Sequence, residues 1–157
     1  MSDRKFSLSV NLSLLQLRAE GFVEELAQQL RDAGVDGQAL ELEITERMLM
    51  DDVDAVRTTL QHVKALGVRI AIDDFGTGYS SLGVLNQLPI DRIKIDRSFV
   101  HGLPGNASHA AIARAIVTLA RSMGCGVIAE GVETEAQRAF LEELGCDELQ
   151  GLLTGAP

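Results

Sequence analysis

Short apolar runs alternate along the chain with longer segments whose apolar residues recur every three or four positions. The short runs are rich in Val, Ile and Leu, as expected of buried strands, and the longer spacing is typical of a helix with one buried face. The strand-like runs are 6–12, 39–45, 68–73, 92–96, 126–130 and 147–152. The clearest helical stripes are Leu49, Val53, Val56, Leu60 and Val63, and Ile112, Ile116, Leu119 and Met123. This order predicts an α/β fold with a parallel sheet, either open and doubly wound or closed as a barrel.

Local signals mark where several helices begin and end. Ser13 followed by Gln16, and Thr134 followed by Gln137, fit the capping box, in which two side chains satisfy free backbone N–H groups at a helix start. Glycines at three expected helix ends can adopt the left-handed conformation that closes a helix. They are Gly34, Gly67 and Gly145.

The composition is typical of one globular domain. The 157 residues, 46% of them hydrophobic, can bury one core but are too few for two ordinary domains, so we expect a single domain over 1–157. No apolar run approaches the roughly 18 residues of a membrane helix, which favours a cytoplasmic location without a membrane segment. Cys125 and Cys146 lie outside any Cys-x-x-Cys spacing. Buried free thiols are therefore favoured over a disulfide or a zinc site.

The charge balance narrows the class of ligand. The chain carries 14 Lys and Arg residues against 23 Asp and Glu, a formal net charge of −9. This excess of acid argues against binding to nucleic acid polymers. A small anionic ligand is still compatible with the sequence, because a bound metal ion can supply positive charge locally.

Polar side chains stand at or near the end of every strand-like run. They are Asn11, Glu43 and Glu46, Asp73 and Asp74, Lys94 and Asp96, Glu130 and Glu133, and Gln150. In parallel α/β folds the carboxyl ends of the strands share one face, where catalytic groups gather. A single acid in such a place is more often a helix cap or a solvated loop residue. Their recurrence at every run favours one shared site, and oxygen ligands without His or Cys suit Mg²⁺ or Mn²⁺ better than zinc.

The pair Asp73 and Asp74 enters a loop that contains two glycines. Two adjacent carboxylates repel each other, so they need a cation or a proton to offset the cost. In the loop, glycines allow the backbone to approach a ligand closely, and hydroxyl residues offer donors suited to phosphate oxygens. The loop residues concerned are Gly76, Thr77, Gly78 and Ser80.

Lys94 lies between two apolar residues, Ile93 and Ile95. Burial would depress its pKa and suit it to orienting or deprotonating a water near the metals. The structural alternative is a core lysine paired with Asp73 or Glu130. The two interpretations are compatible.

Six motifs follow one another across nearly the whole chain. They are SVNLS at 9–13, ELEITE at 41–46, IDDFGTGYSSL at 72–82, IKIDRSFV at 93–100, IAEGVET at 128–134 and LQG at 149–151. In this order they resemble the EAL-type cyclic di-GMP phosphodiesterases. The resemblance implies a TIM-like (β/α) barrel that opens cyclic di-GMP to linear pGpG with two Mg²⁺ or Mn²⁺ ions.

The same resemblance implies roles for individual residues. The metal ligands would be Asn11, Glu43, Asp73, Asp74 and Glu130. Catalytic roles near the attacking water would fall to Lys94, Glu130 and Gln150. Glu46 would anchor the loop after Asp74, and further loop or substrate residues would be Thr77, Gly78, Ser80, Asp96 and Glu133. Ca²⁺ is expected to inhibit, because its larger and more flexible shell fits poorly in a site built for smaller ions.

The sequence departs from the family pattern before Asn11. The family's Glu-Ala-Leu motif, whose glutamate is a metal ligand, is expected there and is not found. Because a (β/α)₈ barrel typically takes about 250 residues, we expect an incomplete barrel with about six β/α units. An open sheet edge invites another chain, which predicts a homodimer or a strand-exchanged oligomer.

The leading hypothesis is thus a cyclic di-GMP phosphodiesterase. The alternative is a catalytically inactive EAL-like module that binds cyclic di-GMP or a protein partner. An unrelated α/β protein with incidental strand-end acids would not explain the order of the motifs.

Overall fold

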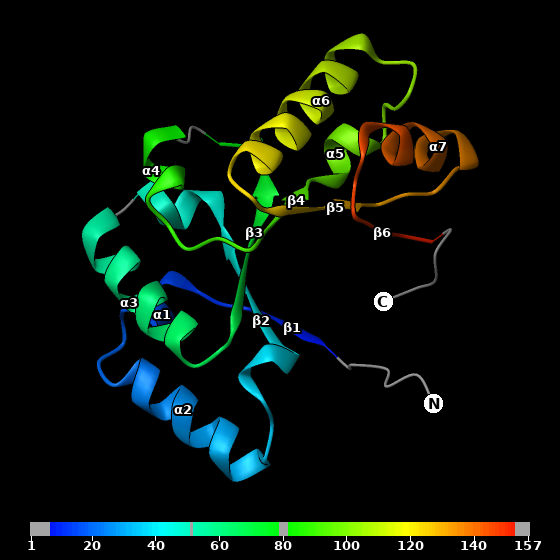
Figure 1. Ribbon diagram of the computed structural model, residues 1–157. Coiled ribbons are helices and arrows are strands. Elements are labelled where there is room, and N and C mark those ends of the chain that lie inside the picture. Colours follow the sequence, from blue (N-terminus) through cyan, green and yellow to red (C-terminus); the bar gives the residue numbers. More distant parts are fainter. Residues whose placement is uncertain (1–6, 51, 79–81, 153–157) are drawn as a thin grey trace. The chain divides into compact units, whose positions relative to one another are not determined.

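The computed structural model describes residues 7–50, 52–78 and 82–152 (Figure 1). Strands and helices alternate along these residues, as the sequence predicts. The elements are β1 (Leu8–Asn11), α1 (Leu14–Arg18), α2 (Phe22–Ala33), η1 (Gly37–Ala39), β2 (Leu40–Thr45), η2 (Glu46–Met50), α3 (Val53–Ala65), β3 (Arg69–Phe75), α4 (Leu82–Asn86), β4 (Arg92–Ile95), α5 (Arg97–Val100), α6 (Ala107–Ser122), β5 (Gly126–Glu130), α7 (Glu135–Leu144) and β6 (Glu148–Gln150). Each strand-like run of the sequence coincides with one of the strands β1 to β6.

The strand boundaries differ from expectation at two places that matter for the site. β3 continues through both acids to Phe75, whose side chain is buried, so the acids belong to the strand itself. β4 ends at Ile95, because Asp96 leaves the sheet and caps the helix that follows. A carboxylate that accepts the first helical N–H groups is more stable there than in a ladder.

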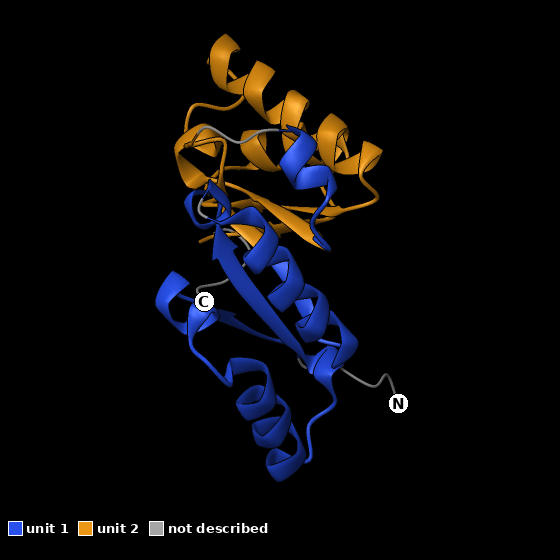
Figure 2. Ribbon diagram, turned by 90° about the vertical axis from the view of Figure 1, so that its left-hand side faces the viewer, with its two compact units in different colours: residues 1–71, 80–90 blue, residues 72–79, 91–157 orange. Residues whose placement is uncertain are grey.

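The elements form two compact units (Figure 2). Unit 1 comprises residues 1–71 and 80–90, and unit 2 comprises residues 72–79 and 91–157. The chain passes from one unit to the other within β3. In unit 1 the strand order is β1-β2-β3, and in unit 2 it is β3-β4-β5-β6. The pairs β1–β2, β4–β5 and β5–β6 are parallel, as the alternating sequence pattern requires.

In unit 1, helices α1, α2 and α3 contact one another. The predicted stripe is confirmed in α3 at Val56, Leu60 and Val63, each no more than 2% exposed, whereas Val53 is half-buried and Leu49 belongs to η2. Leu42 and Ile44 of β2 are also buried. Burial of such a side chain contributes roughly 1.5 to 3 kcal/mol, so this apolar stripe holds α3 in place.

In unit 2, α6 contacts β4 and β5, and Figure 1 shows it running beside these strands. The buried face of α6 contains Ala113, Ile116, Val117 and Ala120. The prediction that Ile112 and Leu119 lie at the centre of the buried face was therefore wrong, because both residues are only half-buried. Alanine lets a helix approach a sheet closely, so small residues mark this face where larger apolar ones were expected.

The expected helix ends are confirmed. Gln16 and Ser13 exchange hydrogen bonds between side chain and backbone, at 3.1 and 2.9 Å, at the start of α1. Gln137 and Thr134 do the same for α7. Gly145 ends α7 with a φ of 95°, a conformation that costs a residue with a side chain more than glycine.

Both cysteines are free thiols, as expected. Cys125 is buried and Cys146 is half-buried. Burial, reinforced by the nearby Asp147 carboxylate and opposed by the Arg121 guanidinium, raises the pKa of the Cys146 thiol to about 11. Burial, reinforced by the charge of Asp91, likewise raises the pKa of Cys125.

These pKa shifts predict slow thiol chemistry, since the thiolate is the reacting form. At pH 8 we expect Cys146 in the folded protein to react with a disulfide reagent about 100-fold more slowly than an unhindered cysteine. Its rate should rise about tenfold per pH unit up to pH 10, and labelling followed by mass spectrometry would measure it. Rapid labelling of Cys146 in the folded protein, at the rate seen in guanidinium chloride, would contradict this.

β1 is exposed at all four of its residues and stands first in the strand order of unit 1. Leu8 and Val10, two apart on one strand face, are 65% and 41% exposed. An exposed apolar edge strand suits pairing with a further strand. The homodimer or strand-exchanged oligomer stays a prediction. Among the described residues, no helix combines the length and the apolar character needed to cross a membrane.

Candidate functional site

Three carboxylates come together in unit 2, at the ends of β3 and β5. Asp73, Asp74 and Glu130 each offer an oxygen atom, and these oxygens lie within 4.8 Å of one another. Asp73 and Glu130 are half-buried, whereas Asp74 is exposed. We call these residues the acid cluster. Three like charges at this separation are unfavourable without a cation or bound protons.

The backbone at Asp74 is unusual, and it sets the direction of the second carboxylate. Asp74 has a φ of 54°, in the left-handed region that residues with side chains seldom adopt. Its N–H donates to Asp73 Oδ1 at 2.9 Å, while its carbonyl accepts from the N–H and the hydroxyl of Thr77, at 3.3 and 2.6 Å. Left-handed conformations at residues with side chains cost of order 1 kcal/mol and cluster at functional sites. These hydrogen bonds hold the two acids in adjacent but different orientations.

Lys94 joins the acid cluster from β4. Its Nζ lies 2.7 Å from Glu130 Oε1, and its side chain is 5% exposed against 21% for Glu130. The expected core lysine paired with Glu130 is thus present. A single buried ammonium beside three carboxylates leaves the cluster with an excess of negative charge.

Asp96 lies next to the cluster and fixes Asp74. Its carboxylate caps α5, accepting from the Ser98 N–H at 2.9 Å and from the Ser98 hydroxyl. Asp74 and Asp96 also share a side-chain hydrogen bond.

The pKa values in the cluster reflect this crowding. Burial raises the pKa of Asp74, and the hydrogen bond to Asp96 and the charge of Asp73 add to it. Burial also raises the pKa of Glu130, against the hydrogen bond and the charge of Lys94. Partial burial pushes the pKa of Asp96 upward, but the two Ser98 hydrogen bonds outweigh it and the pKa is lowered. Without a cation, Asp74 and Glu130 therefore hold protons more tightly than isolated carboxyls would.

Two further candidates stand beside Glu130. Gln150 on β6 is the direct neighbour of Glu130 in the parallel register, so their side chains share a sheet face. Gln150 is exposed, and its carbonyl accepts from the Val132 N–H at 3.0 Å. Glu133 is also exposed, and its N–H donates to Gln137 Oε1 at 2.8 Å. Gln137, which sequence reasoning treated only as a helix cap, thus fixes the chain just after Glu130.

Asn11, Glu43 and Glu46 belong to unit 1. Asn11 and Glu43 are register partners on β1 and β2, so they share one sheet face. Asn11 is exposed, Glu43 is 9% exposed and Glu46 is 3% exposed. Burial of two carboxylates in such a small unit requires polar partners, and both residues do make polar interactions.

Two of the three predicted loop residues, Thr77 and Gly78, lie among the described residues of unit 2. Thr77 and Gly78 are exposed, and the Thr77 hydroxyl is engaged with the Asp74 carbonyl. Thr77 therefore shapes the turn after the acids in addition to any contact with a ligand. Ser80 lies outside the described residues.

Sequence reasoning missed two rings that lie behind this turn, Phe99 of α5 and His109 of α6. Their ring centroids are 5.9 Å apart and their planes are nearly perpendicular, at 87°. Phe99 could have been noticed, because it lies within the motif at 93–100. The role of His109 could not be predicted from the sequence, because only the fold brings this residue next to Phe99.

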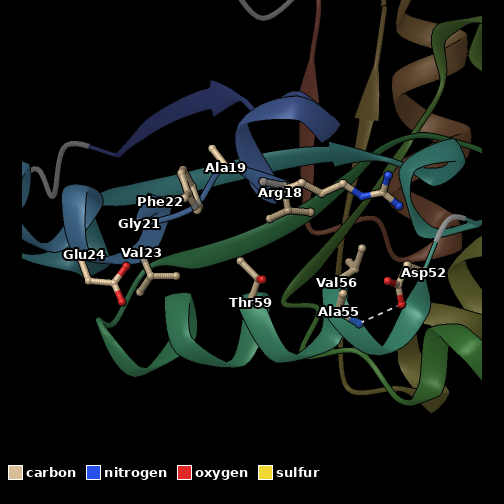
Figure 3. Close-up of a pocket in the computed structure, with 11 residues that line it drawn as sticks. Arg18, Ala19, Gly21, Phe22, Val23, Glu24, Asp52, Ala55, Val56 and Thr59 are labelled. Carbon is tan, nitrogen blue, oxygen red and sulfur yellow. Dashed lines mark hydrogen bonds between the residues drawn. The ribbon is translucent and has the colours of Figure 1, made fainter.

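A pocket of about 550 Å³ lies in unit 1, lined mainly by α1, α2 and α3 (Figure 3). Arg18, Glu24 and Asp52 are its charged residues, beside apolar side chains such as Phe22 and Val56. Asp52 Oδ1 accepts from the Ala55 N–H at 3.3 Å, so this acid caps α3. Two acids against one base do not suit a phosphate ligand, and none of the described residues that line the pocket belongs to the predicted site.

The arrangement in unit 2 can bind a divalent cation through carboxylate oxygens. It also presents a buried ammonium next to those oxygens. Such a combination is suited to polarising a phosphodiester and to positioning a water molecule.

The family model described as EAL domain matches residues 1–157. The bifunctional diguanylate cyclase/cyclic di-GMP phosphodiesterase MucR of Pseudomonas aeruginosa is 47% identical over 152 residues, which cover 97% of this chain and 22% of MucR. The cyclic di-GMP phosphodiesterase NbdA of the same organism is 42% identical over 153 residues, covering 98% of this chain and 20% of NbdA. The chain spans about a fifth of the length of these curated relatives.

Solved structures of EAL-domain proteins are also similar to this chain. The MucR phosphodiesterase in complex with c-di-GMP superimposes with a TM-score of 0.92 at 47% identity, covering 96% of this chain and 61% of that one. The EAL domain of Mycobacterium smegmatis DcpA gives a TM-score of 0.90 at 44% identity, covering 96% and 68%. Klebsiella pneumoniae BlrP1 was solved as calcium and as manganese complexes with cy-diGMP. Both structures give a TM-score of 0.87 at 32% identity, covering 96% of this chain and 38% of the BlrP1 chain.

Proposed function

The chain belongs to the EAL domain family, and from this premise we propose that it hydrolyses cyclic di-GMP to linear pGpG with two divalent metal ions. Its fold is the TIM-like (β/α) barrel of that family in incomplete form, with six strands among the described residues. Relatives in the family are cyclic di-GMP phosphodiesterases, and solved members bind this dinucleotide. The activity of this chain, its product and its metals are the content of the proposal.

The observation that carries the proposal is the acid cluster beside Lys94. Its donor set consists of carboxylate oxygens, with no His or Cys, which fits a hard cation such as Mg²⁺ or Mn²⁺. A related protein, BlrP1, has been solved with manganese and with calcium. Asp73, Asp74 and Glu130 would hold the metals in unit 2. The further ligands Asn11 and Glu43, and the loop anchor Glu46, rest on the family resemblance and stay predictions.

When bound, two divalent ions acidify water and neutralise the charge that develops on the phosphodiester oxygens. In the reaction the water oxygen forms a bond to phosphorus, one phosphorus–oxygen bond to ribose breaks, and the ribose oxygen gains a proton. No electron transfer is involved. The chain's own groups have to orient the water and hold the protons that move.

Lys94 is the residue we assign to the attacking water. Its ammonium is fixed by Glu130 at 2.7 Å and shielded from solvent, so its remaining N–H groups have defined directions. Gln150, on the same sheet face as Glu130, would assist by a side-chain hydrogen bond. Thr77 and Gly78, and the predicted loop residue Ser80, would contact the substrate, while Asp96 and Glu133 would support the acids from the segments that follow β4 and β5.

The remaining expectations concern the protein as a whole. We propose that residues 1–157 are part of one EAL domain. A cytoplasmic location and the homodimer or strand-exchanged oligomer stay predictions.

A hydrolysis assay with cyclic di-GMP, with products separated by chromatography, tests this function. Turnover is expected with Mn²⁺ or Mg²⁺ and linear pGpG is the expected product. Ca²⁺ added to the Mn²⁺ reaction should inhibit, because its flexible shell of six to eight ligands places the reacting groups poorly.

A parallel calorimetric titration with cyclic di-GMP separates the two candidate functions. Binding without turnover in any of these metals would refute the enzyme and favour the inactive module. Full activity in Ca²⁺ alone would contradict the proposed metal preference.

A further inference from the structure

The turn after the acid cluster rests on an apolar support. A Cβ atom added to Gly76 would lie 2.8 Å from Phe99 Cε2 and 3.4 Å from Ile116 Cδ1. The backbone of the turn therefore lies directly against a ring from α5 and a methyl group from α6. We call Phe99 and Ile116 the shelf.

Gly76 is required at this point for two independent reasons. Its φ is 97°, and it occupies the third position of a turn closed by the Thr77 N–H and the Asp74 carbonyl, as in a type II turn. A side chain here would also collide with Phe99. The first residue of the same turn is Asp74, so the position of the turn fixes the position of a cluster carboxylate.

The shelf is itself held from behind. His109 meets Phe99 edge-to-face, at 5.9 Å between ring centroids. The imidazole fits because residue 102 is glycine, since a Cβ there would lie 2.2 Å from His109 Nδ1. This nitrogen is buried and has no hydrogen-bond partner among the described residues. A buried polar atom without a partner is costly, so packing against Phe99 has to hold the ring there.

We propose that Phe99, supported by His109, is a positioning residue that holds the turn at 74–77 and thereby aims the Asp74 carboxylate at the metal site. The inference rests on the proposed function only for the presence of a metal ion. The effect of the rings on Asp74 would pass through the backbone of Gly76, against which Phe99 packs. Groups that orient metal ligands from behind change metal affinity or activity by about 10- to 100-fold when they are replaced.

The test is the Mn²⁺ affinity of Phe99→Leu, measured by calorimetry. Leucine removes the ring under Gly76 while keeping an apolar side chain. The matched control is Phe140→Leu in α7. The Phe140 ring is not part of the shelf, and its centroid lies 5.4 Å from Arg114 Cζ. We expect Phe99→Leu to weaken Mn²⁺ binding about tenfold and to lower kcat more than it changes KM, while Phe140→Leu keeps wild-type affinity.

All variants would be measured below their unfolding temperatures, determined by circular dichroism. Should Phe99→Leu fail to fold, His109→Ala replaces it, since it removes the support of the ring and leaves the ring in place. Mn²⁺ affinity equal to that of Phe140→Leu would overturn the inference. Absence of Mn²⁺ binding to the wild-type protein would instead overturn the proposed function, so the two failures are distinguishable.

Discussion

Replacing Asp73 with Asn is expected to lower the hydrolysis of cyclic di-GMP by more than about 100-fold. Changes behind a metal site cost up to about 100-fold, and the loss of a direct carboxylate ligand should exceed that. Asp73 is central to the cluster, since it faces Glu130 and accepts the N–H of Asp74. The amide keeps the size and one oxygen but removes the charge. Steady-state rates at saturating Mn²⁺ would measure the loss.

The matched control is Asp54→Asn on α3, where the carboxylate is 85% exposed and pairs with Arg57. Exposed pairs contribute little, so this variant should keep its rate. The thermal stability of Asp73→Asn should not fall, because it relieves repulsion with Asp74 and Glu130. Turnover by Asp73→Asn within a few-fold of wild type would show that this residue is not a ligand.

Replacing Lys94 with Met should reduce both stability and activity. Removing one partner of a buried ion pair leaves the other uncompensated, at a cost of about 3 to 5 kcal/mol. Since the Glu130 side chain is still 21% exposed, we expect a cost near the lower end, about 3 kcal/mol. If Lys94 orients the water, turnover should also fall by about 10²- to 10⁴-fold. Denaturant unfolding and steady-state kinetics measure the two effects.

A second variant tests whether the loss of stability comes from the uncompensated charge of Glu130. In Lys94→Met/Glu130→Gln neither partner of the ion pair is left charged, so most of the stability should return, while turnover stays low because both proposed site residues are changed. Lys64→Met on α3 is the control for replacing a lysine elsewhere and should change neither property. Recovery of hydrolysis in the double variant would contradict the roles assigned to both Lys94 and Glu130 in the reaction.

Much of the fold could be predicted because its signals are local. Buried strands need apolar runs, and both capping boxes need side chains only three residues apart, at Ser13 and Thr134. The meeting of Asp73 with Glu130 was also predictable, since parallel strands bring their carboxyl ends together. The buried face of α6 was less so, because its alanines give no hydrophobic contrast in the sequence.

The parts that could not be predicted depend on contacts between distant residues. The left-handed backbone of Asp74 is accompanied by hydrogen bonds to Asp73 and Thr77. An aspartate in the sequence does not by itself predict this conformation. Gly76 packs against Phe99, which lies 23 positions later in the sequence. From the sequence alone, the same glycine was equally compatible with a close approach of the backbone to a ligand. Sequence identifies the chemistry of the site, whereas the fold shows what holds it in shape.

The most direct test of the metal site is a calorimetric titration of Mn²⁺ into the wild-type protein, Asp73→Asn and Asp54→Asn. If Asp73, Asp74 and Glu130 hold divalent metal, the wild type and Asp54→Asn will bind Mn²⁺ with equal affinity, and Asp73→Asn will lose most of that binding. Identical titrations of all three proteins would contradict the assignment of the acid cluster as the metal site.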